Sequence, residues 1–163
     1  MSLATAIMAA MHLWAPVSAH AYYEAPAITE ARYMQIASDI ATVAKEEPIG
    51  TPYQTGLLLA SIASYESGGY RADVVFCRVS GDHDKAWGLF QSHAPREAVC
   101  RSLQDAARIA LGQVRDSLER CASNPEATRL AAYTSGSCDR GWLAARRRWE
   151  RAQEWLREHP WCD

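Results

Sequence analysis

The residue best suited to acid/base chemistry is Glu66, a carboxylate that a helix would bury. Ala63 and Ile62 lie three and four positions before it and are apolar, so helical periodicity puts Glu66 on an inward face. Gly68 and Gly69 follow, which places Glu66 in the last turn, where the helix dipole disfavours negative charge. Burial and dipole both favour the protonated form that a general acid needs. Taken alone, an inward glutamate is more often a hydrogen-bonded structural acid, so its neighbouring motifs must decide.

Three short motifs occur in a fixed order, and the first contains Glu66. They are Glu66–Gly69, Gly88–Gln91 and Ala132–Gly136. Together they resemble the three motifs of the soluble-type lytic transglycosylases, which are relatives of goose-type lysozyme, and the intervals are typical of that family. The resemblance covers roughly residues 52–136. It implies a lysozyme-like fold and cleavage of the MurNAc-GlcNAc β-1,4 bond of peptidoglycan to give 1,6-anhydro-MurNAc ends.

The resemblance also implies a role for each motif residue. Glu66 would be the catalytic acid/base, Ser67 would hydrogen-bond near it, and Tyr133 would hold it through the phenol hydroxyl. Gln91 would reach the sugar beside the scissile bond, and Phe90 would wall the cleft.

Two positions depart from the family pattern. Phe90 stands where methionine is usual, which exchanges one apolar group for another. Thr134 stands where asparagine is usual after the tyrosine, and it changes the substrate-binding wall at that point. Neither departure removes a group that the chemistry requires.

The number of carboxylates separates two enzymatic outcomes. Most glycosidases use two carboxylates, whereas a lytic transglycosylase uses one, because the substrate's own C6 hydroxyl attacks the anomeric carbon. Asp73, Asp82 and Asp84 are candidates for a second carboxylate, and turn-forming residues in an exposed hairpin are the alternative. A hydrolase in which Asp82 or Asp84 positions a water is therefore the nearest rival. A non-catalytic wall-binding or assembly protein on the same fold is a third hypothesis.

No cofactor or metal is expected. His83 and His93 flank the second motif, but no further ligand follows at a fixed spacing. Surface or cleft histidines are the better interpretation.

The elements that would carry these residues are mostly helical. Apolar periodicity, caps and breakers predict helices over residues 29–47, 52–67, 102–121, 124–133 and 139–158. Residues 70–85 contain valines and a Gly-Asp-His-Asp turn, which predicts a short β-hairpin or an irregular loop. The fold class is therefore mainly α, a lysozyme-like (α+β) single domain with a small hairpin or loop insertion.

The final predicted helix has an apolar stripe and a basic face. The stripe recurs at helical spacing, which favours core over a sugar-stacking surface. Its members are Trp142, Ala145, Trp149, Ala152 and Leu156. Residues 146–148 are all arginine, lie mostly off this stripe and are expected to be solvated.

The first 21 residues allow two interpretations. Residues 3–14 are apolar over the length of a signal peptide, and Ala19-His20-Ala21 resembles a cleavage site. No Lys or Arg precedes the stretch, so a helix that packs on the domain is the alternative. We expect residues 1–21 to be an export signal and residues 22–163 the transglycosylase domain.

Five cysteines support export, because disulfides persist in oxidising compartments. None forms a C-x-x-C pair. Pairing of neighbours, Cys77 with Cys100 and Cys121 with Cys138, would staple the two loop regions that hold the second and third motifs. Buried free thiols are the alternative.

Composition limits the partners. The chain has 163 residues and a formal net charge of -2, which fits one domain and offers no basic excess for nucleic acid. No apolar run reaches the roughly 18 residues of a membrane span. The expected partner is the peptidoglycan glycan strand, met by a monomer in the periplasm or outside the cell. Such an enzyme could serve a secretion apparatus or a phage particle.

Overall fold

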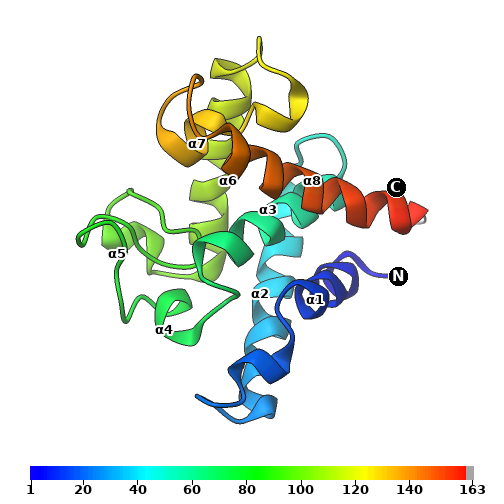
Figure 1. The fold of residues 1–163 in the computed structure, drawn as a ribbon. Helices are drawn as coiled ribbons and strands as arrows, with labels where there is room; N and C mark the ends of the chain where they lie inside the picture. The colour runs from blue at the N-terminus through cyan, green and yellow to red at the C-terminus, as the bar shows by residue number, and fades with distance from the viewer. Residues whose placement is uncertain (161–163) are drawn as a thin grey trace.

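The computed structural model describes residues 1–160, in which helices gather around α3 (Figure 1). The elements in chain order, with η for a 3-10 helix, are α1 (Leu3–Trp14), η1 (Val17–His20), α2 (Pro26–Glu46), α3 (Pro52–Glu66), α4 (Ala72–Val75), α5 (Arg96–Val99), α6 (Leu103–Arg120), η2 (Glu126–Thr128), α7 (Ala131–Ser135) and α8 (Trp142–Glu158). The prediction of a mainly helical single domain is confirmed.

Helix α3 forms the centre because it is apolar on every side. Every residue from Thr55 to Ser64 is buried, and a helix of this kind is stable only when other elements cover it all round. Helices α1, α2, α6 and α8 pack on it. Its first turn is closed by Thr51 and Gln54, whose side chains each accept from the other's backbone N–H at 3.2 and 3.0 Å.

The end of α3 sets the place of Glu66, its last residue. Gly68 and Gly69 follow with φ of +60° and +79°. This left-handed backbone stops the helix, as the sequence predicts, and only glycine adopts it without strain. Glu66 therefore sits where α3 ends and the chain turns away.

Helix α1 packs tightly into the core. Its buried residues are Leu3, Ala6, Ile7, Ala10 and Met11. A side chain at Gly56 of α3 would bring its Cβ to 2.8 Å from Ile7 Cδ1, so the two helices approach as closely as a glycine allows. The Tyr33 hydroxyl donates to the Ala15 carbonyl at 2.8 Å and ties the end of α1 to α2. Such contacts are expected if residues 1–21 form a helix that packs on the domain, which is the alternative to an export signal.

The predicted helix bounds differ from the structure mainly at ends. Helix α2 begins at Pro26 rather than Thr29, because a proline suits the first helical turn, and the Thr29 hydroxyl donates to Glu24 instead. Ser102, at the start of the helix predicted over 102–121, is the N-cap of α6, since its hydroxyl accepts from the Asp105 N–H at 3.0 Å. The helix predicted over 124–133 is two short pieces, η2 and α7.

Residues 70–92 contain no strand, and the loop alternative describes them better. Residues predicted as strand-like form the short helix α4 instead. Two isolated antiparallel bridges, Gly81 with Ala86 and Trp87 with Ser92, make consecutive tight turns. Asp82, His83 and Asp84 all have positive φ, a conformation that short polar side chains tolerate.

Helix α8 keeps the predicted stripe only in part. Ala145, Ala152 and Leu156 are buried, whereas Trp142 is 54% exposed and lies outside the core. The helix begins at Trp142, whose indole N–H donates to the Cys138 carbonyl at 2.7 Å at the surface. Arg146 and Arg147 are exposed as expected, but the Arg148 side chain is only 12% exposed, and the expectation that it is solvated is wrong.

The structure contains both disulfides expected between neighbouring cysteines. Cys77 is bonded to Cys100 and Cys121 to Cys138; Cys162 lies outside the described residues. Among residues 1–160, no helix is both long and apolar enough to cross a bilayer.

Removal of residues 1–21 should lower the melting temperature. The deletion uncovers the faces of α2 and α3 on which α1 packs. Burial of each lost Leu, Ile or Met side chain stabilises the fold by roughly 1.5–3 kcal/mol. The melting temperature should therefore fall by an amount on the order of 10 °C. Thermal unfolding of residues 1–163 and 22–163 by circular dichroism measures it. Leu13→Ala, on the exposed side of α1, is the control and should change little. Equal melting temperatures would mean that α1 is dispensable, as expected of an export signal.

Candidate active site

A cleft of about 630 Å³ collects most of the residues that the motifs single out. Six motif residues were given a role in the sequence, and all except Ser67 line this cleft. They come from the end of α3, from the loop before α5 and from α7. These are Glu66, Phe90, Gln91, Tyr133 and Thr134. Segments far apart in sequence thus meet at one surface.

Glu66 is paired with Arg148, which the sequence analysis missed. The carboxylate oxygen Oε1 accepts from Arg148 Nη2 at 2.7 Å and from Nε at 3.2 Å. The two side chains are 22% and 12% exposed, so the pair is largely shielded from water. The guanidinium thus places a positive charge directly against the carboxylate at the end of α3, which offsets the cost of partly burying that charge. The two residues are 82 positions apart, so no local pattern could have revealed the contact.

Tyr133 lies across the cleft, with a different hydrogen-bond partner from the one that the family resemblance implies. Its hydroxyl donates to the carbonyl of Phe90 at 3.2 Å, and its backbone N–H donates to Ser117 Oγ at 2.9 Å. Burial raises the pKa of Tyr133 well above its ordinary value, and the nearby charge of Glu66 adds to the effect. Tyr133 therefore stays neutral and joins α6, α7 and the second motif.

Ser67 does not lie in the cleft. It is fully buried; its hydroxyl donates to the Ala63 carbonyl at 2.6 Å and accepts from the Tyr70 N–H at 2.8 Å. These bonds close the last turn of α3, where free carbonyl groups need partners. Its place in the structure is that of a helix-terminating residue rather than a substrate contact.

Gln91 and Thr134 face the cleft with part of their hydrogen-bonding capacity already used. Gln91 has a φ of +45°, and its Nε2 donates to the Gly88 carbonyl at 3.1 Å. Its amide oxygen lies over Gly81, where a Cβ would collide with it. The Thr134 hydroxyl donates to the Ala131 carbonyl at 3.1 Å within α7.

Of the three candidate second carboxylates, Asp82 lines the cleft. It lies 3.3 Å from His93 Nε2, and both side chains are more than half exposed. Asp84 bonds to the Ser80 hydroxyl, and Asp73 is paired with Arg71 at 2.5 Å. Asp73 and Asp84 therefore serve local turns, and the carboxylate that remains in reach of a cleft ligand is Asp82.

Helix α6 also lines the cleft, beside the third motif on α7, and its cleft residues were not singled out in the sequence. Gln113, Asp116 and Arg120 line it. Their spacing of three and then four residues puts them on one helical face, and only the packing of α6 identifies that face as the cleft side. Across residues 1–160, no cluster of three or more histidine, cysteine or acidic side chains could hold a metal ion.

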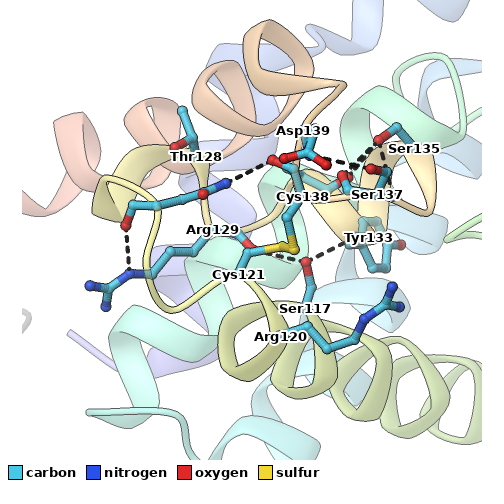
Figure 2. The surroundings of a disulfide bond; sticks show 12 residues. Ser117, Arg120, Cys121, Thr128, Arg129, Tyr133, Ser135, Ser137, Cys138 and Asp139 are labelled. Atoms are coloured by element: carbon cyan, nitrogen blue, oxygen red, sulfur yellow. Dashed lines mark hydrogen bonds between the residues drawn. A yellow bond between two sulfur atoms is a disulfide. The ribbon is translucent and has the colours of Figure 1, made fainter.

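The Cys121–Cys138 disulfide closes the α6 side of the cleft at its base. Figure 2 shows the bridge joining the end of α6 to the segment after α7, with Arg120 and Tyr133 beside it. Asn124 Nδ2 donates to the Cys138 carbonyl at 2.8 Å and strengthens the link. The other disulfide lies under the second motif, where a Cβ at Gly88 would be 3.4 Å from Cys77 Sγ.

No family model, curated protein or solved structure matches this chain.

Tyr133→Phe should destabilise the protein by about 1 kcal/mol, because it removes the hydroxyl that bonds the Phe90 carbonyl. Urea unfolding measures the change, and Tyr22→Phe, at an exposed tyrosine, is the matched control. Unchanged stability would contradict the role of Tyr133 as a link across the cleft.

Loss of the Cys121–Cys138 bridge should lower stability by roughly 3 kcal/mol, since it closes a loop of this length. The Cys121→Ser, Cys138→Ser double variant tests this by urea unfolding, with Cys162→Ser as control. Thiol titration of the denatured, non-reduced wild type should find one free thiol. Five free thiols in protein from an oxidising compartment would contradict both bridges.

Proposed function

We propose that this protein is a peptidoglycan lytic transglycosylase on a lysozyme-like helical domain, with Glu66 as its single catalytic acid and base. The observation that carries the proposal is the convergence of Glu66, Gln91 and Tyr133 on one cleft. They belong to three motifs that resemble those of one enzyme family. Motifs that matched by chance would have no reason to share a surface.

The cleft suits a reaction with one carboxylic acid. Glu66 gives its proton to the glycosidic oxygen, and the bond from that oxygen to C1 of muramic acid breaks. The C6 hydroxyl then attacks C1 and returns its proton to Glu66, so the anhydro ring forms and no water is consumed. Assistance from the N-acetyl group takes the place of a second carboxylate. Gln91 and Thr134 bind the sugar, and Phe90 and Tyr133 shape the wall.

The two disulfides support a place of action outside the cytoplasm. Cys77–Cys100 lies under the second motif and Cys121–Cys138 beside the third, and such bonds persist in oxidising compartments. An exported enzyme that acts on the wall would meet these conditions.

Asp82 supports a hydrolase as the second candidate. It lines the same cleft as Glu66, and its exposed carboxylate could orient a water for attack on C1, as in two-carboxylate glycosidases. The products separate the two reactions, because an anhydro end is lighter than a hydrolysed end by one water.

Glu66→Gln should abolish cleavage of purified sacculi, because the amide keeps the shape of the side chain and cannot donate the proton. The expected loss is on the order of 10²- to 10⁴-fold or more. Release of soluble fragments, followed by mass spectrometry of their ends, measures the rate and the product. Glu119→Gln, at an exposed position on α6, is the matched control and should remain active.

Each other outcome selects a different hypothesis. Hydrolysed ends that disappear in Asp82→Asn would favour the hydrolase. A folded wild type that binds sacculi without cutting them would favour a wall-binding protein. Substantial activity in Glu66→Gln would contradict the single-acid mechanism.

A further inference from the structure

The carboxylate of Glu66 is held at one of its two oxygens. Both hydrogen bonds from Arg148, at 2.7 and 3.2 Å, end on Oε1. Within residues 1–160, no hydrogen bond to Oε2 accompanies them. The two oxygens of the acid are therefore not equivalent in the folded protein.

Arg148 is itself held in place from several directions. Its Nη1 donates to the Ala144 carbonyl at 2.9 Å, and its guanidinium lies 5.0 Å from the centre of the Tyr65 ring. Its own carbonyl accepts from Ser61 Oγ of α3 at 2.8 Å, which fixes the register of α8 on α3. Such supports lock a planar, five-donor group in one orientation.

The other charged or titratable groups around the cleft do not hydrogen-bond to the Glu66 carboxylate. Asp82 and His93 come from the loop, Asp116 and Arg120 from α6, and Tyr133 from α7. Asp82 and His93 are paired with each other, and Tyr133 donates to the Phe90 carbonyl. Among residues 1–160, Arg148 is the cation that contacts the acid.

We propose that Arg148 is the positioning residue of the catalytic acid: it binds Oε1 and leaves Oε2 to exchange the proton with the substrate. The proposal rests on the function proposed above. In the first step the Oε2–H bond breaks, the proton passes to the glycosidic oxygen, and the C1–O bond to the leaving sugar breaks. In the second step the C6 oxygen bonds to C1, and its proton returns to Oε2. Arg148 stabilises the carboxylate that exists between the two steps.

This role predicts a loss of kcat with little change in KM. Arg148 contacts Glu66 but is not among the residues that line the cleft. Arg148→Met should therefore leave substrate binding largely intact and slow the chemical step, because the acid is no longer held by one oxygen.

Three variants separate charge, positioning and helix packing. Arg148→Met removes the charge and both hydrogen bonds. Arg148→Lys keeps the charge but lacks the planar fork that binds one oxygen through two N–H groups. Arg151→Met is the matched control: Arg151 lies one turn further along α8, stacks on the same Tyr65 ring at 4.2 Å and bonds Ser64 rather than Glu66.

The experiment measures kcat and KM separately on a soluble glycan-strand fragment, with near-ultraviolet circular dichroism as the test of folding. For Arg148→Met we expect kcat to fall about tenfold or more, with KM little changed. For Arg148→Lys we expect a similar loss of kcat, because lysine keeps the charge but lacks the planar fork. For Arg151→Met we expect the kcat and KM of wild type.

Arg148→Lys covers the case in which Arg148→Met does not fold, because it keeps the positive charge beside Glu66. A folded Arg148→Lys with the kcat of wild type would overturn the positioning role, and so would a folded Arg148→Met with the kcat of wild type. In both cases a wild type that cleaves leaves the proposed function standing. A wild type that produces no cleavage overturns the proposed function and this proposal with it.

Discussion

The ion pair between Glu66 and Arg148 is the interaction on which the arrangement of the cleft depends. A carboxylate at the C-terminal end of a buried helix is unfavourable, because burial and the helix dipole both oppose its charge. A cation within hydrogen-bond distance offsets that cost, and α8 must pack on α3 in the one register that brings Arg148 there. The Ser61 bond to the Arg148 carbonyl secures the same register through the backbone. Removal of either partner would leave the other charge poorly compensated.

The two sides of the cleft are held together by different means. The wall of α6 and α7 is closed by a covalent bond, Cys121–Cys138, and by the Ser117 hydroxyl, which binds the Tyr133 N–H. The facing loop is built from consecutive turns that contain positive φ angles, and Cys77–Cys100 ties it to α5. Tyr133 crosses between them to the Phe90 carbonyl. The cleft thus keeps its shape without a β-sheet.

The core explains why these elements can be so short. Helix α3 is covered on all sides, and α1 is one of the helices that cover it (Figure 1). Gly56 lets α1 approach within side-chain contact of the α3 backbone. Because the centre of the domain is packed by long helices, the short pieces α4, α5 and α7 need only disulfides and turns to hold the motif residues at the surface.

The sequence by itself determined the features that depend on neighbouring residues. The glycines after Glu66 end α3, and Ser102 caps α6. Each disulfide joins two cysteines that follow one another in the order of cysteines along the chain. Local backbone preferences and short loops decide such features, so a pattern of nearby residues contains them. Helix ends and the short helix α4 were less predictable, because packing overrides weak propensities there.

Only the tertiary structure decided which groups surround the acid. A row of three arginines on a helix predicts a solvated face, yet Arg148 turns inward because α8 crosses the end of α3. Ser67 satisfies the end of its own helix instead of facing the cleft, and the Tyr133 hydroxyl reaches a backbone carbonyl 43 residues away. Contacts over such separations depend on how whole helices cross, and that geometry is the sum of many packing contacts that no single motif encodes.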